Sequence, residues 1–433
     1  MTSGSTNEEL SRRGFALTAW AALVATTIGV SLLAYRGAAP SAITFAIAAS
    51  FVPYLAMLLL APRAFDPRLA LRLAILALIV VGLSLVFAPP VLSDDVFRFA
   101  WEGRLWREGF NPYLVPPDHP TLKPLRDPVW HGINNKPLAS IYPPLAQALF
   151  VLASFLGDGV VPIKLLALGG HVATTLSVAR LSDDPRAPLA IALNPLLLSA
   201  TALDGHLDVL VGLALLACAW GLAHHRVGRA VVATVLAVGL KVVGLVFVPL
   251  FVRRPRALVA VLVGSAAFLW PMVVFRPAQD AASGPLQFAE RWRGNESLFA
   301  VVDWGVGLVA PEETATTLAR AICAGAVFAL CLGLAIRRVP TLSAARIVLW
   351  ATLLLSPQVH PWYLAWLLPL EVVSGRFAGL VWSAAALVAY LPLDRWLTDG
   401  VWEPSPLLQA AEYGLVAAAL VLEHRLRRVA HST

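Results

Sequence analysis

The sequence predicts an all-α integral membrane protein with a long outer loop. Of its 433 residues, 58% are hydrophobic and only 14% are charged, and the mean hydropathy is +0.74. A soluble domain usually carries about 25% charged residues. One helical crossing of a bilayer takes about 20 apolar residues, so we expect a bundle of about 12–13 transmembrane helices. A soluble multidomain enzyme is excluded.

The charged residues and the cysteines exclude two further classes. In a chain with so few charged residues, the net charge of +7 is a sign of loop orientation. The sequence has no basic run with interleaved aromatic residues, so nucleic acid is not expected as a partner. Cys218, Cys323 and Cys331 all lie inside apolar runs. They predict neither a disulfide framework nor a metal-thiolate site.

Apolar runs follow one another along the whole chain and give the expected elements. The first run is followed at once by others, so it predicts a retained helix rather than a signal peptide. The runs are 14–34, 41–61, 69–88, 142–156, 160–179, 187–203, 207–223, 229–252, 256–275, 317–336, 342–356, 361–373, 376–392 and 406–423. They divide the chain into a tail (1–13), three helices (14–88), a first outer loop (89–141), central helices (142–275), a second outer loop (276–316), C-terminal helices (317–423) and a tail (424–433).

Arginines in the short loops set the expected orientation. The positive-inside rule places loops rich in Lys and Arg in the cytoplasm. Both termini are then cytoplasmic, and the two long polar segments, 89–141 and 276–316, face outward. The arginines are Arg63, Arg68, Arg72, Arg226, Arg229, Arg253, Arg254, Arg256, Arg337, Arg338, Arg425, Arg427 and Arg428.

Two central segments, 142–180 and 229–253, each carry enough apolar residues for one or two crossings. In the second, Gly239, Lys241 and Gly244 interrupt the run. We expect a broken or re-entrant element there, which membrane proteins tolerate where protein covers the backbone or the backbone lines a cavity.

The first outer loop opens with two adjacent carboxylates, Asp94 and Asp95. Adjacent like charges raise one pKa toward a value useful to a general base, and together they can hold a divalent ion. The structural alternative is a helix start with Ser93 as the N-cap. The short helix that follows would also carry Arg98, Glu102 and Arg104, and the spacing places Asp95, Arg98 and Glu102 on one face. Dense prolines after this helix predict short interfacial helices within the loop.

Further candidates lie outside this loop. Asp204, His206 and Asp208 form a second acidic set that could bind a metal or a sugar hydroxyl, or could simply be an outward turn. Lys241 is the single lysine in an apolar run, and if it faces a cavity it would suit the binding of a phosphate. The alternative is that its ammonium group snorkels to the membrane surface.

Aromatic residues accompany the last two candidate sets. Arg291, Trp292, Arg293 and Asn295 fit either an interfacial belt or recognition of a lipid phosphate and a sugar ring. His360 between two prolines is either structural or part of the same site, and its nearness to Trp362 and Tyr363 favours the site.

Together these segments resemble a known family. The run from Asp94 to Arg104, then Gly109-Phe110-Asn111-Pro112-Tyr113 and Tyr142-Pro143-Pro144-Leu145-Ala146-Gln147, is similar to the first outer loop of bacterial GT-C polyprenyl-phosphate-sugar glycosyltransferases. It is nearest to the glycosyltransferase 87 and alpha-1,6-mannosyltransferase group. Gly205 to Asp208, Lys241, Trp292 to Phe299 and His360 to Tyr363 resemble later motifs in the same order.

The resemblance implies a GT-C-like bundle and a specific reaction. A sugar, mannose first of all, would pass from a polyprenyl-phosphate donor to a lipid-linked or glycan acceptor on the outer face of the cytoplasmic membrane, with inversion. Asp95 matches the position of the general base, and Asp94 is the second candidate. The residues expected to bind the phosphate or sugar of the donor are Arg98, Glu102, Arg104, Lys241, Arg291, Trp292, Arg293, Asn295, His360 and Tyr363. No tightly bound cofactor is implied; a divalent cation, held by Asp94, Asp95 and Asp208, is an open alternative. Membrane lipids are the remaining partners.

Two other classes of function compete with this prediction. A lipid or sugar-lipid transporter would line a pathway with the same charged residues, but such proteins commonly show symmetry between halves, and none is visible in this sequence. A non-enzymatic assembly subunit would use the polar loops only to dock a partner. The clustering of acids and Trp/Arg motifs on one side makes an enzyme the better prediction.

Overall fold

The computed structural model describes residues 3–275, 287 and 292–432. Most of the predicted second outer loop before Trp292, including Arg291, lies outside these residues. The chain divides into two compact units. The first unit comprises residues 1–93, 164–209 and 371–433, and the second comprises 94–163 and 210–370.

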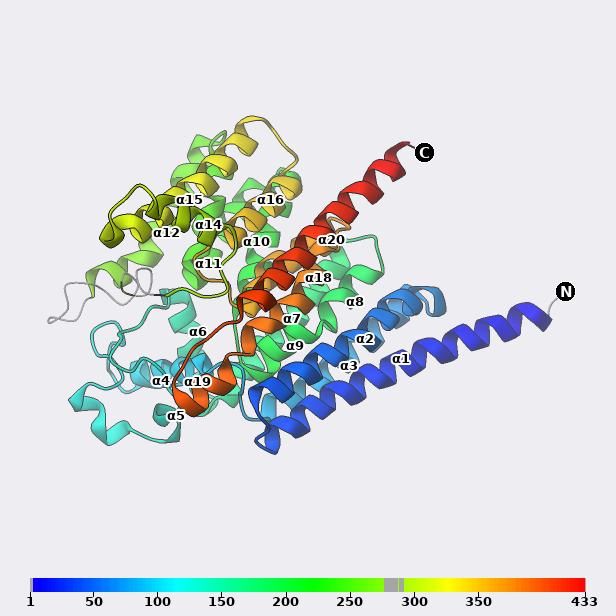
Figure 1. Ribbon diagram of the computed structural model, residues 1–433, viewed down its shortest axis with the longest axis horizontal. Coiled ribbons are helices and arrows are strands. Elements are labelled where there is room, and N and C mark those ends of the chain that lie inside the picture. Colours follow the sequence, from blue (N-terminus) through cyan, green and yellow to red (C-terminus); the bar gives the residue numbers. More distant parts are fainter. Residues whose placement is uncertain (1–2, 276–286, 288–291, 433) are drawn as a thin grey trace. The chain divides into compact units, whose positions relative to one another are not determined.

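The first unit is built from long helices and short ones that bend. Its N-terminal helices lie side by side, and α20 lies against α18 (Figure 1). Asp66 caps α3 by accepting from the amides of Arg68 and Leu69. The elements are α1 (Ser3–Tyr35), α2 (Pro40–Ala64), α3 (Pro67–Phe87), α7 (Val161–Leu181), α8 (Arg186–Ala192), α9 (Pro195–Leu198), the π-helix η2 (Ser199–Leu203), α18 (Ala378–Ala385), η5 (Ala386–Tyr390), α19 (Leu393–Asp399) and α20 (Pro406–Ser432).

The second unit contains most of the predicted first outer loop, from Asp94 on, and the middle of the chain. α4 packs against α5 and α6, and α14 packs against α15. Its elements are α4 (Asp95–Arg107), η1 (Pro120–Leu125), α5 (Pro128–His131), α6 (Pro144–Ser154), α10 (Asp208–Ala223), α11 (Val227–Leu240), η3 (Val242–Phe251), α12 (Pro255–Val274), α14 (Leu298–Gly307), α15 (Glu312–Ile336), α16 (Thr341–Leu354), η4 (Pro361–Tyr363) and α17 (Leu364–Val373).

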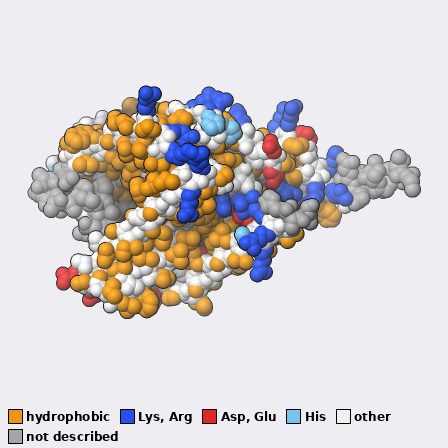
Figure 2. Space-filling view, turned by 90° about the horizontal axis from the view of Figure 1, so that it is seen from above, with side chains coloured by type: hydrophobic (Ala, Val, Ile, Leu, Met, Phe, Trp, Pro, Cys, Tyr) orange, Lys and Arg blue, Asp and Glu red, His pale blue; other side chains and the backbone are white. Residues whose placement is uncertain are grey.

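The fold class predicted from composition is confirmed. Within the described residues, seven helices are long and apolar enough to cross a membrane, or eight if the pair bent by 40° at residues 186–203 is one span. Apolar side chains such as Phe45, Val52 and Leu59 of α2 are more than half exposed, and Figure 2 shows hydrophobic side chains over much of the surface in view. Such a surface is typical of helices that face lipid.

The helix lengths differ from the expected 12–13 full spans. Several predicted crossings form shorter apolar helices of 10–17 residues, among them α6, α10, α11 and α16. The run 142–156 gives only the 11-residue α6, which packs on α4. Apolarity alone therefore did not distinguish a full span from a short helix that is covered by its neighbours.

The predicted break in the segment 229–253 is confirmed. α11 ends at Leu240, Lys241 has an extended backbone (φ −158°, ψ 134°), and a 3-10 helix follows. A Cβ atom on Gly244 would lie 2.5 Å from the amide nitrogen of Val238, so the return of the chain here requires glycine. The break places Lys241 outside regular helix.

The first outer loop folds around short helices, as predicted. η1 and α5 follow α4, and a small apolar cluster of Trp101, Leu105, Leu122 and Ile133 joins them. Asp127 caps α5 by accepting from the amide of Trp130. The loop is therefore a packed structure that can hold side chains in fixed positions.

Gly103 lies where α4 and α6 approach closely. A Cβ atom there would lie 2.2 Å from the carbonyl oxygen of Phe150, which is backbone and cannot swing away. We expect Gly103→Ala to lower the unfolding free energy by about 1–3 kcal/mol through overpacking. The matched control is Gly305→Ala in α14, where nothing lies within 4 Å of the new methyl group. Thermal unfolding in detergent measures both, and equal midpoints would contradict the packing described.

Candidate active site

Asp94 and Asp95 stand at the N-terminal end of α4. The helix begins at Asp95, and Asp94, not Ser93, occupies the N-cap position without a capping hydrogen bond from its side chain. The alternative interpretation of Ser93 as the N-cap is therefore wrong. The Asp94 carboxylate instead accepts a hydrogen bond from the side-chain amide of Asn134. Burial raises the pKa of Asp94, and the charge of Arg98 opposes that shift only in part.

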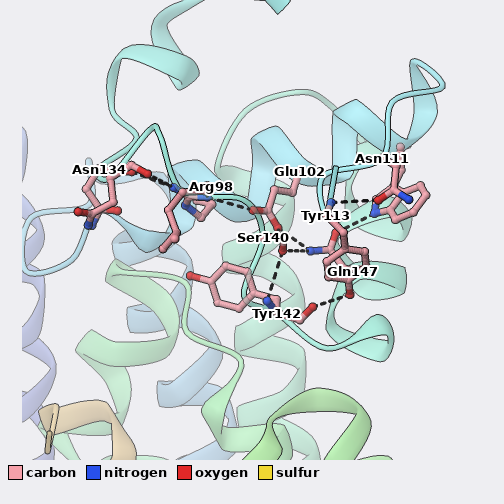
Figure 3. Close-up of polar contacts among 11 residues, drawn as sticks. Arg98, Glu102, Asn111, Tyr113, Asn134, Ser140, Tyr142 and Gln147 are labelled. Atoms are coloured by element: carbon pink, nitrogen blue, oxygen red, sulfur yellow. Dashed lines mark hydrogen bonds and ion pairs between the residues drawn. The ribbon is translucent and has the colours of Figure 1, made fainter. Parts of the chain in front are cut away.

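Arg98 ties the helix to the loop that follows it. Its guanidinium donates to the carbonyl oxygens of Leu138 (3.0 Å), Asn134 (3.0 Å) and Asn135 (2.8 Å), and it lies 3.4 Å from Glu102 (Figure 3). The shared face of Arg98 and Glu102 predicted from their spacing is confirmed by this ion pair. Both side chains are buried, at 4% and 1% exposure. Arg98 thus fixes Asn134, which bonds to Asp94.

Glu102 is the centre of a second set of hydrogen bonds. Ser140 Oγ donates to it at 2.7 Å, and Gln147 Nε2 donates to it at 2.5 Å (Figure 3). Trp106 donates in turn to the oxygen of Gln147 at 2.8 Å. Burial raises the pKa of Glu102 despite the positive charge of Arg98. The contacts join α4, α6 and the loop between them.

Arg104, like Arg98, ties α4 to the loop that follows it. It lies 2.6 Å from Asp127 and donates to the carbonyl oxygen of Leu125 at 3.0 Å. We predicted that Arg98, Glu102 and Arg104 bind the donor; the contacts described show each of them holding the loop. Donor binding by these three side chains stays a prediction.

Tyr142 links the acidic end of α4 to the rest of the site. Its ring packs edge-on against Phe99 (centroids 5.0 Å apart) and Phe150 (5.5 Å). Burial raises the pKa of Tyr142, and the negative charge of Asp95 adds to the shift. Tyr363 lies within electrostatic range of the same phenol. Asp95 and Tyr363 thus both act on the Tyr142 phenol, and all three residues belong to the second unit.

Lys241 lies over two aromatic rings. Its Nζ is 4.2 Å from the centroid of Tyr363 and 5.0 Å from that of Trp366. Burial, together with the charge of Lys241, lowers the pKa of His360 to about 3. The structure therefore brings together Lys241, His360 and Tyr363, which the sequence predicted as parts of one site.

The remaining part of the second outer loop meets the His360 segment. Gly294 pairs with the strand-like stretch around Gln358, donating to Pro357 O (3.1 Å) and accepting from Val359 N (2.9 Å). Trp292 and Asn295 flank this bridge in sequence. Arg293 is held by Glu296 (2.6 Å) and Asp303 (2.7 Å), and the hydrogen bond that it donates to Glu296 raises the pKa of Arg293. Phosphate binding by these residues, and by Arg291, stays a prediction.

The second acidic set belongs to the first unit. Asp204 is fully buried and accepts from the amides of Val91 (3.0 Å) and Leu92 (3.1 Å). Its carboxylate thus fixes the chain directly before Asp94. His206 and Asp208 are also buried, at 1% and 7% exposure.

The possible metal site has no further support in the geometry. Among the residues that the structure describes, no group of three His, Cys, Asp or Glu side chains could hold a metal ion. Asp94 and Asp95 belong to the second unit and Asp208 to the first. A divalent ion held by Asp94, Asp95 and Asp208 stays a prediction.

Sequence reasoning missed several polar residues of the site. Asn134, Ser140 and Gln358 were not among the candidates, and Tyr142 and Gln147 were noted only as parts of a motif. Asn134 lies 40 residues from Asp94, and Gln147 lies 45 residues from Glu102. The only local signal was a polar or proline-bracketed residue within an otherwise apolar stretch.

The fold and this arrangement define a multi-pass helical membrane protein whose acidic site is held by a folded loop. Residues 11–255, more than half of the chain, match the family described as alpha-(1->6)-mannopyranosyltransferase, N-terminal domain. The chain belongs to that family and is therefore a glycosyltransferase. The resemblance found in the sequence is confirmed, and an enzyme is favoured over a transporter or an assembly subunit. No curated protein and no solved structure matches the chain.

Proposed function

We propose that the protein transfers mannose from a polyprenyl-phosphate donor to a lipid-linked or glycan acceptor, with Asp95 as general base. The observation that carries the proposal is the shared environment of Asp95 and Lys241. Tyr142 lies in the electrostatic range of both Asp95 and Tyr363, and Lys241 lies on the Tyr363 ring. A base and a cation thus each interact with one of two tyrosines whose charges act on each other.

The reaction needs a base at one end and charge stabilisation at the other. The acceptor hydroxyl oxygen attacks the anomeric carbon while Asp95 takes its proton. The bond between that carbon and the phosphate oxygen breaks, and the lipid phosphate leaves with the electron pair. Attack opposite the leaving group inverts the configuration. Lys241 offsets the charge that develops on the phosphate.

The lipid-linked donor agrees with the apolar surroundings. Lys241 follows α11 and precedes the apolar η3, so a phosphate bound there would have its lipid chain beside apolar helices. A polyprenyl chain favours such a setting over water. We propose the outer face of the cytoplasmic membrane for this site, with both termini on the cytoplasmic side. The free ends of α1 and α20 point the same way in Figure 1, which supports a common side for the termini.

Lys241→Met removes the proposed phosphate contact. A hydrogen bond to a charged group contributes about 1.5–3 kcal/mol, so we expect kcat/KM for the lipid donor to fall about 10–100-fold. Lys241→Arg keeps the charge and should retain most of the activity. Lys123→Met is the matched control, because it removes one positive charge at an exposed position of η1 and should leave the activity unchanged. Equal activity of Lys241→Met and Lys123→Met would contradict the role of Lys241.

The choice of donor is tested with two forms of labelled mannose. Membranes that contain the protein are supplied either with polyprenyl-phosphate-mannose or with nucleotide-activated mannose while synthesis of the lipid form is blocked. We expect product only from the lipid form. Product from the nucleotide form alone would overturn the proposed donor.

A further inference from the structure

Gln358 is held in one position by its backbone. Its amide donates to Ser356 Oγ at 3.2 Å, and its carbonyl accepts from the same hydroxyl at 2.6 Å. The backbone hydrogen bonds to Gly294 hold Pro357 and Val359, the residues on either side of Gln358. The residue is 8% exposed, and its Oε1 is buried.

The Gln358 side chain has one polar atom engaged and one without a partner. Its Nε2 donates to His360 Nε2 at 2.6 Å. Among the described residues its Oε1 is buried and has no hydrogen-bond partner. An unsatisfied buried acceptor costs about 1–3 kcal/mol and therefore calls for an explanation.

The surroundings of this oxygen suit a sugar. The His360 ring stacks on Trp362 (4.1 Å between centroids) and meets Tyr363 edge-on (5.2 Å). Flat aromatic rings next to a fixed hydrogen-bond acceptor offer both an apolar wall and a partner for a hydroxyl. The neutral His360 accepts from the Gln358 amide and so keeps the amide oxygen turned away from itself.

The donor sugar, rather than the acceptor, is the group expected beside Gln358. His360 lies in the electrostatic range of Lys241, which is the proposed phosphate contact. In a lipid-phosphate sugar the hexose is attached directly to that phosphate. A hydroxyl of the transferred hexose is therefore within reach of the residues next to Lys241.

We propose that Gln358 determines donor-sugar specificity, its amide oxygen accepting a hydrogen bond from one hydroxyl of the transferred hexose. This inference rests on the proposed function. A site that hydrogen-bonds a hydroxyl rejects the analogue that lacks it, because the buried acceptor then stays unpaired. Gln358 would thus act by discrimination between sugars, with no part in proton transfer.

The test compares polyprenyl-phosphate-mannose with analogues that each lack one hydroxyl of the sugar. For wild type we expect kcat/KM to fall about 10–100-fold for one analogue. In Gln358→Met, the kcat/KM for this analogue should come within about threefold of the kcat/KM for polyprenyl-phosphate-mannose. The ratios for the other analogues should stay as in wild type. The ratio of two donors on one preparation is independent of the folded fraction. Gln358→Asn, which withdraws the same amide by one methylene group, should reduce the same ratio and serves if the Met variant does not fold.

The outcomes separate this inference from the proposed function. Gln409→Met in α20 is the matched substitution outside the site and should keep all wild-type ratios. Wild-type ratios at every hydroxyl in an active Gln358 variant would overturn the role of Gln358 alone. No transfer from any lipid-phosphate sugar by wild type would overturn the proposed function and this inference together.

Discussion

Asp95→Asn is expected to reduce mannose transfer by about 10²–10⁴-fold, the usual contribution of a general base. The amide keeps the size of the side chain but does not accept the proton of the acceptor hydroxyl. Because Asp95 is the first residue of α4 and only half-buried, the helix and the Arg98 framework should persist. Single-turnover transfer from polyprenyl-phosphate-mannose measures the effect, with the amount of folded protein determined in parallel.

Asp94→Asn tests which of the two adjacent carboxylates, Asp94 or Asp95, is the general base. The Asp94 carboxylate already accepts a hydrogen bond from the side-chain amide of Asn134, so one of its oxygens is engaged and it is the less available base. We expect the Asp94 variant to lose less activity than the Asp95 variant. The reverse order would assign the base to Asp94, and full activity of Asp95→Asn would remove Asp95 from the mechanism.

Arg98→Met should have the largest effect on stability. It leaves Glu102 buried without its cation and frees the carbonyl oxygens of Asn134, Asn135 and Leu138. Removing one partner of a buried pair costs about 3–5 kcal/mol. We expect a lower thermal midpoint in detergent and faster proteolysis within the loop.

A surface ion pair provides the control for Arg98. Arg395 of α19 pairs with Glu403, and both side chains are more than half exposed. Arg395→Met therefore removes the same charge at a cost of about 0–1 kcal/mol. Equal stability of the two variants would show that Arg98 does not hold the loop.

The fold class and the broken helix at Lys241 were predictable because both depend on local sequence. Apolar content identifies a membrane protein, and Gly239, Lys241 and Gly244 together mark a point in an apolar run where helix is disfavoured. The pair of Arg98 and Glu102 was predictable for the same reason, because a four-residue spacing fixes the shared face.

The partners of these residues depend on tertiary packing and were not predictable. Nothing near Glu102 in sequence indicates Ser140 or Gln147, which reach it only after the loop folds back onto α4. The short helix α6 was expected as part of a full span, because apolar content does not distinguish a helix that crosses the bilayer from a short helix that packs on protein. The free acceptor of Gln358 likewise required atomic geometry.

The most direct test of the central claim uses the purified protein in liposomes with labelled polyprenyl-phosphate-mannose and a membrane extract as the source of acceptor. Mass spectrometry of the extracted lipids would follow both products. We predict one new mannosylated acceptor for each polyprenyl phosphate released, and loss of both products in Asp95→Asn. Movement of the intact donor across the bilayer without any covalent product would contradict the account.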